Sequence, residues 1–296
     1  MRWGIMGTGG VAHAFAEALK DVPGVVLAGA WSREASKAQA FLHAQDAGGA
    51  MFGQYLGLTC AADVEAVYVA TPASHHHAHA LLALRAGKHV LCEKPFAVSE
   101  TQARAMFLEA HDRGLLIMEA MWPRFLPSYA KLRELLDAEA VGDIRAFAAS
   151  FGGRAEYAPK TRAFRPERGG GALLDAAVYP ISLAQLVLGS FAEVHAVGQI
   201  GPSGVDEQVA ILLRTETGQI ASLMAGIRTT FAGNAVIYGT DGMIMIPGNC
   251  TDPSWIEVHR PNCEPEHYDF PLGTHRLAWQ AVAIQCYVGE GMTEAP

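Results

Sequence analysis

Lys94 is the residue whose position most clearly suggests chemistry. It follows the apolar run His89–Cys92 in the segment Glu93-Lys94-Pro95, and the proline fixes the chain direction there. An ammonium group at the end of a strand can donate a hydrogen bond to a ligand oxygen and stabilise negative charge that develops on it. An ordinary lysine is protonated at neutral pH, so we expect a donor and not a base. The alternative is a surface lysine in a turn.

A second candidate pair, Asp175 and Tyr179, lies in the apolar segment Ala172–Leu188, for which we expect a helix. Residues four positions apart share one face of a regular helix, although Pro180 lacks the backbone donor that such a helix needs. A phenol can exchange a proton with a ligand when a neighbouring ammonium lowers its pKa. The alternatives are a carboxylate near a helix start and a core aromatic.

A glycine-rich turn stands near the start of the chain. It follows the expected strand Arg2–Met6, opens an expected helix, and reads Gly7-Thr8-Gly9-Gly10-Val11-Ala12. In dinucleotide-binding turns the first glycine permits the tight turn, the second admits a pyrophosphate, and a small third residue lets helix and sheet pack closely. The free amides of the helix start then face the phosphates. The strand–turn–helix context favours a dinucleotide site over an ordinary turn.

The end of the second expected strand bears on the choice of dinucleotide. It reads Trp31-Ser32-Arg33, with no carboxylate at the tip to hold a ribose 2′-hydroxyl, and Glu34 comes one residue later. A hydroxyl and a guanidinium suit a 2′-phosphate, because arginine can bind it through two hydrogen bonds. We therefore expect Ser32 and Arg33 to favour NADP over NAD. The alternative for Arg33 is a solvated surface residue.

Strands and helices alternate over the first 120 residues, which predicts a parallel sheet covered by helices on both faces. The expected strands are Arg2–Met6, Val25–Trp31, Ala66–Ala70, His89–Cys92 and Leu115–Glu119. The expected helices are Val11–Lys20, Ser36–Ala44, His77–Ala86 and Thr101–Arg113. We assign residues 1–120 to a Rossmann dinucleotide-binding domain.

The pattern changes after Trp122, where strands separated by short, glycine-rich turns predict a largely antiparallel sheet. Two helices are expected, Ser128–Ala138 and Ala172–Leu188. The expected strands are Ile144–Phe151, Glu193–Ile200, Gln208–Arg214, Gln219–Ile227, Ala235–Tyr238 and Met243–Ile246. We assign residues 121–296 to an α+β domain for substrate binding and dimerisation.

Composition argues against several classes of protein. The chain has 296 residues, enough for two domains, and half of them are apolar. A formal net charge of −8 without a basic stripe argues against nucleic-acid and anionic membrane partners. No apolar stretch is long enough for a bilayer span and no leader pattern is seen, so we expect a cytoplasmic protein.

Cysteine and histidine spacing does not suggest a metal or a disulfide framework. The five cysteines are widely spaced and form no C-x-x-C pair, as expected for reduced thiols. His75, His76 and His77 are adjacent, so their side chains point in different directions and rarely share one ion. We expect no metal site.

Three further segments carry a family resemblance. They are Ala70-Thr71-Pro72, the run Gly87–Pro95 that contains the E-K-P triplet, and the run Gly169–Asp175 that opens the second-domain helix. Together with the N-terminal glycine turn they resemble the glucose–fructose oxidoreductase, inositol dehydrogenase and MocA-type family. The resemblance covers nearly the whole chain, and E-K-P is its most specific mark.

Within that family the chain most resembles the dimeric dihydrodiol dehydrogenase group. The similarity is carried by the segments Glu119–Phe125, Arg162–Pro166 and Asp175–Pro180, with Tyr179 where many relatives have histidine. The resemblance implies an NADP-dependent oxidoreductase that moves a hydride to or from a hydroxyl or carbonyl carbon of a small polyol, sugar or dihydrodiol. It also implies a homodimer through the open face of the second-domain sheet.

The resemblance also implies residue roles. Lys94, Asp175 and Tyr179 would face the nicotinamide as the catalytic group. Further cofactor contacts would come from Thr71, Pro72, His76, Glu93 and Lys94 itself. By their own chemistry Trp122, with a flat apolar ring, and Arg124, with donors for hydroxyls or the cofactor amide, are candidates for the substrate wall. Arg162 and Tyr179 complete the predicted substrate site. Packing at the domain junction is the alternative for Trp122 and Arg124, and a role outside the substrate site is the alternative for Arg162.

Some features depart from the family pattern or leave a rival function open. Ala73 stands where relatives often have asparagine, Ala177 replaces a common glycine, and relatives typically continue past Pro296 with one more helix that packs on the first domain. A non-catalytic NADP sensor on the same fold is the alternative function, although such proteins tend to lose the lysine or the proton donor. The substrate and the direction of the reaction stay open.

Overall fold

The computed structural model describes residues 1–52, 55–271, 273 and 275–295 and divides the chain into two compact units. The first unit comprises Met1–Trp122 together with Gly273–Pro296, and the second comprises Pro123–Leu272. The sequence-based assignment of residues 121–296 to one domain was therefore wrong at its C-terminal end. Helix α8 (Ala278–Gly289) packs on α1 (Gly10–Leu19) of the first unit.

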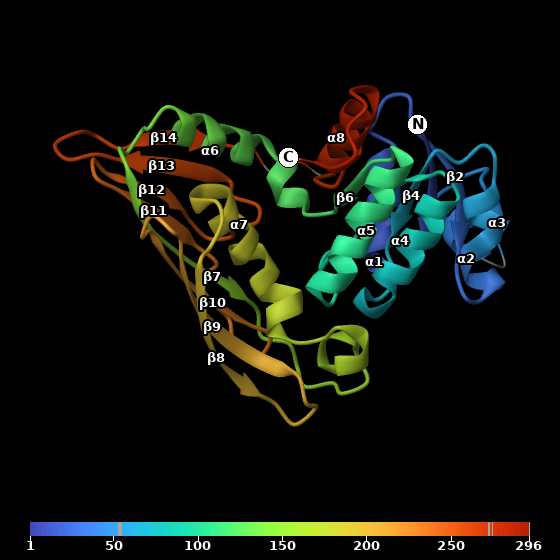
Figure 1. The fold of residues 1–296 in the computed structure, drawn as a ribbon, viewed down its shortest axis with the longest axis horizontal. Coiled ribbons are helices and arrows are strands. Elements are labelled where there is room, and N and C mark those ends of the chain that lie inside the picture. Colours follow the sequence, from blue (N-terminus) through green and yellow to red (C-terminus); the bar gives the residue numbers. More distant parts are fainter. Residues whose placement is uncertain (53–54, 272, 274, 296) are drawn as a thin grey trace. The chain divides into compact units, whose positions relative to one another are not determined.

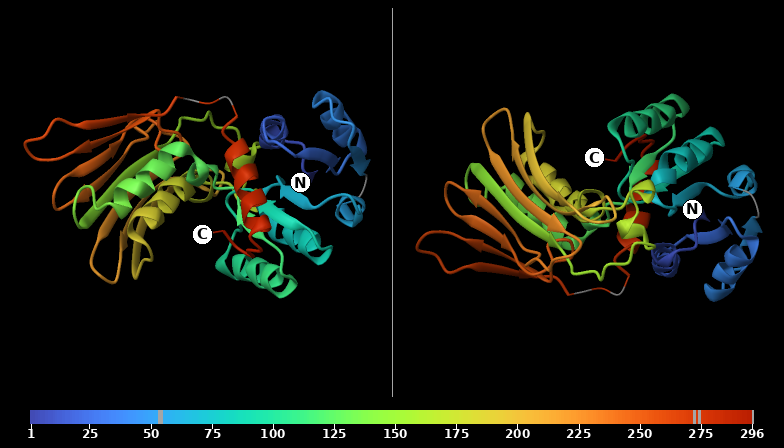
Figure 2. Two further views of the ribbon diagram at one scale, coloured as in Figure 1. Left: turned by 90° about the horizontal axis from the view of Figure 1, so that it is seen from above. Right: turned by 90° about the horizontal axis from the view of Figure 1, so that it is seen from below.

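The described residues of the first unit form a six-stranded parallel sheet with helices on both faces (Figures 1 and 2). The strand order is β3-β2-β1-β4-β5-β6. The strands are β1 (Arg2–Met6), β2 (Val26–Trp31), β3 (Ala50–Phe52), β4 (Ala66–Val69), β5 (His89–Cys92) and β6 (Ile117–Glu119). The chain reverses its direction across the sheet between β1 and β4, so the expected Rossmann fold is confirmed. Such a switch point leaves a crevice at the carboxyl ends of the strands.

Besides α1 and α8, the helices of this unit are α2 (Ala35–Ala44), α3 (Tyr55–Cys60), α4 (His76–Arg85) and α5 (Glu100–Arg113). Four of them, α1, α2, α4 and α5, begin and end within one residue of the prediction, whereas α3 and α8 were not predicted. Local signals explain α5, because the Ser99 hydroxyl accepts the Gln102 N–H at its start and Gly114 adopts a left-handed conformation at its end. Strand β4 is buried on both faces, as its continuous apolar run implies.

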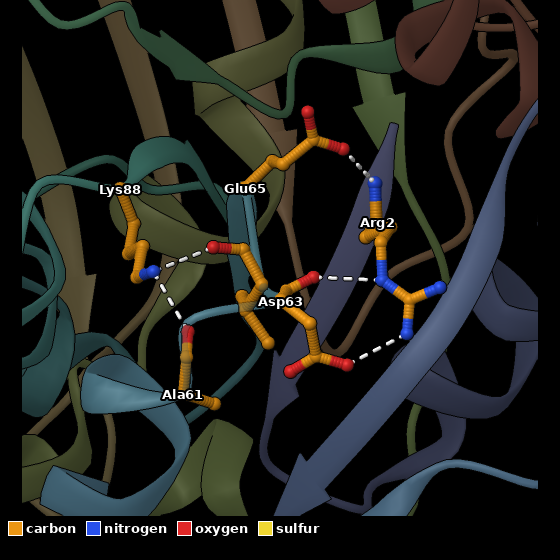
Figure 3. Close-up of polar contacts among 6 residues, drawn as sticks. Arg2, Ala61, Asp63, Glu65 and Lys88 are labelled. Carbon is orange, nitrogen blue, oxygen red and sulfur yellow. Dashed lines mark hydrogen bonds and ion pairs between the residues drawn. The ribbon is translucent and has the colours of Figure 1, made fainter.

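Two cations hold the turn that precedes β4, at the end of the sheet opposite the glycine turn (Figure 3). The buried Lys88 ammonium donates to the carbonyl oxygens of Ala61, at 2.8 Å, and Val64, at 2.6 Å. Arg2 donates from its guanidinium to the carbonyl and the carboxylate of Asp63. Lys88 therefore satisfies buried backbone acceptors, a structural use of lysine that contrasts with Lys94 at the other end of β5.

The second unit is an eight-stranded, mostly antiparallel sheet, counted over its described residues, in the order β14-β13-β12-β11-β7-β10-β9-β8. Its strands are β7 (Ile144–Gly152), β8 (Glu193–Ile200), β9 (Asp206–Arg214), β10 (Ile220–Gly226), β11 (Ala235–Gly239), β12 (Met243–Ile246), β13 (Trp255–His259) and β14 (Glu266–Asp269). Helices α6 (Pro127–Asp137) and α7 (Val178–Leu188) lie on the same face of the sheet (Figure 2). The expected α+β architecture is confirmed.

The start of the long second-unit helix differs from the prediction of a regular helix over Ala172–Leu188. Residues Leu173–Ala177 form a π-helical turn, and the α-helix α7 begins only at Val178. Pro180 explains the wider turn, since its nitrogen cannot donate and its ring would clash with the Ala176 carbonyl in a regular helix. Asp175 and Tyr179 therefore do not have the simple one-face relation that their spacing suggested.

The stretch 166–188 passes a test of length and composition for a membrane span, with a mean hydropathy of 1.6, and no other described segment does. A core helix of a folded domain passes the same test. Here α7 packs on β7 and β10, and Pro180, Leu183 and Ala184 are buried. Packing against the sheet therefore accounts for the apolar character of this stretch.

Candidate active site

The glycine turn lies at the carboxyl ends of β1 and β4, where the first unit would hold a dinucleotide. Gly7 has a φ of +109°, and a Cβ atom there would lie 2.5 Å from the Ala70 carbonyl oxygen. A Cβ on Gly9 would meet no atom of the described residues within 4 Å, and Gly9 has an ordinary extended backbone. Packing thus requires Gly7 but not Gly9, and an open backbone at Gly9 is what a closely approaching pyrophosphate needs.

Helix α1 starts directly after this turn and its amino end suits an anion. No side chain caps it and its first turn carries no acidic residue. The amides of Gly10 and Val11 are therefore available for phosphate oxygens, helped by the positive end of the helix dipole. Thr8 is half-buried within the turn and Val11 is exposed. These residues fit the pyrophosphate of a dinucleotide.

The tip of β2 carries the residues predicted to choose between NADP and NAD. Ser32 is nearly buried and Arg33 is exposed. Lys37 donates to the Glu34 carboxylate at 2.6 Å, and this bond holds the pKa of Glu34 below its usual range. The carboxylate nearest the strand tip is thus engaged by a lysine, while the Arg33 guanidinium lies in solvent.

The E-K-P turn follows β5 and is built on a buried carboxyl group. Glu93 accepts the Tyr68 hydroxyl at 2.5 Å and the Lys94 backbone N–H at 3.2 Å. Burial raises the pKa of Glu93 to about 7, against the opposing effects of the Tyr68 hydrogen bond and the Lys94 charge. Tyr68 thus holds the Glu93 carboxyl group, which in turn accepts the Lys94 backbone N–H. A direct contact of Glu93 with the cofactor stays a prediction.

The loop after β4 is held against the E-K-P turn by His76, the first residue of α4. Its ring lies between the carbonyl oxygens of Thr71, 2.7 Å from Nε2, and Pro95, 2.8 Å from Nδ1. The side chain is only 1% exposed. His76 thus links the two loops that carry Thr71, Pro72 and Lys94, and the sequence did not reveal this contact.

In the second unit the structure brings together two predicted residues, Arg162 and Asp175. One guanidinium nitrogen of Arg162 donates to both carboxylate oxygens of Asp175, at 2.8 and 2.9 Å. Arg162 lies in a short 3₁₀ turn (Arg162–Phe164) and Asp175 in the π-turn. Tyr179 is half-buried, with its ring 5.0 Å from that of Phe151 at the end of β7. Catalytic roles for Asp175 and Tyr179 stay predictions.

Trp122 and Arg124 both lie in the 3₁₀ turn Trp122–Phe125. The Arg124 guanidinium donates to the hydroxyl and the carbonyl oxygen of Ser182, at 3.0 and 3.1 Å, and to the Gln185 side chain at 3.1 Å. These bonds tie the turn to α7. They show a structural use of Arg124, whereas its predicted contact with substrate remains untested.

Asp206, at the start of β9, is a residue that the sequence analysis missed. Its carboxylate accepts the Leu173 N–H at 2.6 Å and caps the helix that carries Asp175 and Tyr179. Gly171, at a φ of +111°, makes room for it, because a Cβ there would lie 2.1 Å from an Asp206 oxygen. Burial raises the pKa of Asp206, although the amides of Leu173 and Ala172 oppose the rise. Asp206 lies 33 residues from Leu173 in the sequence, so no local capping motif could have predicted this contact.

In the described part of the chain no group of three His, Cys, Asp or Glu side chains could hold a metal ion. None of the five cysteines forms a disulfide.

Family models match both units of the chain. One described as "Oxidoreductase family, NAD-binding Rossmann fold" matches residues 1–121, and one described as "GFO/IDH/MocA C-terminal domain" matches residues 129–245. The chain belongs to the GFO/IDH/MocA family. This membership confirms the predicted resemblance and makes the chain an NAD(P)-dependent oxidoreductase.

Curated relatives of this GFO/IDH/MocA protein include trans-1,2-dihydrobenzene-1,2-diol dehydrogenases. The pig enzyme (Sus scrofa) is 35% identical over 92% of this chain and 80% of its own length. The mouse enzyme (Mus musculus) is 35% identical over the full chain and 90% of its own length.

Solved structures support the same fold. A 3-ketoreductase from Actinomadura kijaniata, in complex with NADP and TDP-benzene, has a TM-score of 0.85 and 31% identity over 99% of this chain and 90% of its own. A levoglucosan dehydrogenase reaches a TM-score of 0.89 at 21% identity, covering 100% of this chain and 91% of its own, which supports the fold alone.

The geometry of the glycine turn predicts different outcomes for substitutions at Gly9 and Gly7. Gly9→Ala should change the free energy of unfolding by about 1 kcal/mol or less, because the added methyl group meets no described atom, yet weaken NADPH binding about tenfold. Gly7→Ala should cost more stability, from backbone strain and the contact with Ala70. Denaturant unfolding and fluorescence titration measure both. Unchanged NADPH binding in Gly9→Ala would contradict a pyrophosphate site at this turn.

The Asp206 cap generates a second prediction. Asp206→Ala should lower the free energy of unfolding by about 1–2 kcal/mol, because the Leu173 amide loses its acceptor, whereas Asp206→Asn retains an acceptor oxygen and should lose less. Ser99→Ala, which removes the cap of α5, serves as the matched control. A free energy of unfolding of Asp206→Ala equal to that of the wild-type chain would show that the cap contributes nothing.

Proposed function

We propose that this chain transfers a hydride between NADP(H) and a hydroxyl or carbonyl carbon of a small polyol, sugar or dihydrodiol. Two features of one sheet edge carry the proposal: the open glycine turn Gly7–Gly10, here called the nucleotide cradle, and the E-K-P turn that fixes Lys94. Both belong to the first unit, on β1 and β5, which the intervening strand β4 separates in the sheet. A nucleotide cradle with an ammonium two strands away is suited to a reaction at an oxygen-bearing carbon.

Each residue has a distinct task in this proposal. Bound NADP would supply or accept the hydride, while the glycine turn and the α1 amides would hold its pyrophosphate. The Lys94 ammonium would donate to the substrate oxygen and stabilise its developing negative charge. The Tyr179 phenol would exchange a proton with that oxygen. Asp175, whose carboxylate accepts two hydrogen bonds from Arg162, would face the nicotinamide together with Tyr179.

The preference for NADP rests on the β2 tip. A 2′-phosphate carries about two negative charges, and the exposed Arg33 can bind it through two hydrogen bonds. The pairing of Glu34 with Lys37 reduces the repulsion that a free carboxylate would exert on the phosphate. The solved 3-ketoreductase relative is also in complex with NADP.

The substrate class is proposed from the relatives. Dihydrodiol dehydrogenases and a 3-ketoreductase both act, by name, at a carbon that bears a hydroxyl or carbonyl group. Trp122, with a flat apolar ring, and Arg162, with further donors, would contact such a substrate. An assay that follows NADPH absorbance against a panel of polyols, aldoses and dicarbonyls tests the proposed class.

Lys94→Ala should lower kcat by about a hundredfold or more, because the substrate oxygen loses its charged donor, while the Kd for NADPH changes little. Tyr179→Phe, which removes only the hydroxyl, should also lower kcat. Steady-state kinetics and fluorescence titration measure these effects. Near-wild-type turnover in Lys94→Ala would remove this lysine from the mechanism.

Arg33→Asp should raise the Kd for NADPH by about tenfold to a hundredfold and change that for NADH far less, because only NADPH carries the 2′-phosphate. Arg145→Asp makes the same charge change on an exposed arginine of the second unit and serves as the control. Equal losses for the two cofactors in Arg33→Asp would refute the 2′-phosphate assignment.

We also propose that the open face of the second-unit sheet pairs with a second copy of this chain. Every residue of β8 is exposed, and β9 and β10 alternate between buried and more exposed residues. The side chains on the open face include Val197, 74% exposed, Leu212, 52% exposed, and Met224, 49% exposed. The other face of β9 is buried, and β9 contacts the π-turn Leu173–Ala177. An extended apolar surface of this kind commonly marks an interface. The dihydrodiol dehydrogenase group that the sequence resembles is dimeric.

Leu212→Glu should convert the dimer to a monomer without unfolding it, because the charge would be buried in the interface. Leu108→Glu, at an exposed position of α5 in the first unit, is the control and should leave the association state unchanged. Sedimentation analysis measures both. A wild-type chain that is monomeric at micromolar concentration would end this proposal.

A further inference from the structure

His76 lies among backbone groups at the carboxyl edge of the first-unit sheet. Its Nε2 atom is 2.7 Å from the Thr71 carbonyl oxygen, and its Nδ1 atom is 2.8 Å from the Pro95 carbonyl oxygen. The residue is 1% exposed, so bulk water does not reach the ring. Both ring nitrogens therefore meet a backbone oxygen at hydrogen-bonding distance.

A carbonyl oxygen can only accept a hydrogen bond. A neutral imidazole has one N–H donor, and its second nitrogen carries a lone pair. With two carbonyl partners, a neutral His76 would set this lone pair against a carbonyl oxygen in a site without water, which leaves two buried acceptors unsatisfied. The imidazolium form has two donors and satisfies both carbonyls with charge-assisted bonds.

His79, one helical turn later on α4, provides a comparison. It is also buried and also contacts Thr71, but through the Thr71 hydroxyl, which can donate or accept, at 3.0 Å. Burial lowers the pKa of His79 to about 4, with smaller effects of His75 and His76, so this ring is neutral at physiological pH. Burial and the helix start disfavour a positive charge on His76 as well, and the two carbonyl acceptors are what distinguishes it.

Charged and titratable groups surround the His76 link on each neighbouring segment. Glu93 and Lys94 directly precede Pro95, and Glu119 on β6 accepts the Phe96 N–H at 2.9 Å. Along α4 itself the groups are His75, His77 and His79. The carboxyls of Glu93, which is buried, and of Glu119, which is half-buried, favour a cation at this edge, while Lys94 and the other histidines oppose it.

We propose that His76 is a doubly protonated positioning residue that ties the β4 loop to the E-K-P turn and thereby fixes Lys94. The proposal rests on the role of Lys94 in the proposed function. With both bonds in place, Thr71 and Pro95 cannot move independently, so the residue before Pro95 keeps its place relative to the glycine turn. His76 itself contacts neither substrate nor reacting atoms in this account.

Long-range ¹H–¹⁵N NMR of the ¹⁵N-labelled full-length chain tests the protonation state without substrate or turnover. At about pH 8, above the ordinary histidine range, both His76 nitrogens should show the shifts of protonated nitrogens. His79 should show one protonated and one unprotonated nitrogen in the same spectrum. A neutral pattern for His76 would overturn the proposal. This result is independent of whether the chain oxidises NADPH, so failure of the proposed function would be seen separately.

Paired variants test the positioning role. His76→Gln keeps at most one of the two links, whereas His79→Gln alters a neutral neighbour on the same helix. We expect kcat to fall about tenfold or more in His76→Gln and clearly less in His79→Gln, because small displacements of a reacting group are costly. The Kd for NADPH and the thermal midpoint are measured alongside. Equal kcat in the two variants would refute the positioning role, and the NMR result stands if His76→Gln fails to fold.

Discussion

The close approach of β1 and β4 at their carboxyl ends constrains the first unit. The turn after β1 passes so near the Ala70 carbonyl that a Cβ atom on Gly7 would lie 2.5 Å from it. This approach brings the glycine turn beside the loop of Thr71 and Pro72, and His76 continues the link to the turn after β5. Three loops from three strands are thereby held together, and they carry most of the residues predicted to bind the cofactor.

The three residues of the E-K-P triplet have different structural roles. Glu93 is turned inward, where Tyr68 and the Lys94 amide occupy its carboxylate, so it acts on the backbone. Pro95 offers its carbonyl to His76. Of the three side chains, that of Lys94 carries the positive charge that suits a ligand oxygen. Its neighbours therefore serve chiefly to hold it, which fits the preorganisation that electrostatic catalysis requires.

The second unit positions its candidate residues by different means. A π-turn at Leu173–Ala177, imposed by Pro180, starts the helix that carries Asp175 and Tyr179, and the distant Asp206 caps it. The Arg162 guanidinium then holds Asp175 from a separate turn. Irregular helix geometry of this type recurs at functional sites, because it directs side chains that a regular helix would place elsewhere.

The α/β and α+β classes, most elements to within one or two residues, the glycine turn and the family could all be predicted from the order of the residues. These features are local, because the alternation of strands and helices, the spacing of the glycines and the E-K-P triplet each depend on residues that are close together in the sequence. The sequence did not predict β3, α3, β13, β14 and α8, which are short, or lack a clear apolar period. Only the tertiary structure showed that residues 273–296 belong to the first unit, that Asp206 caps the helix and that His76 meets two carbonyls. The His76–Thr71 contact joins residues 5 positions apart, and the Asp206–Leu173 contact joins residues 33 positions apart. Such contacts depend on how separate elements pack, and a local sequence pattern does not encode that packing.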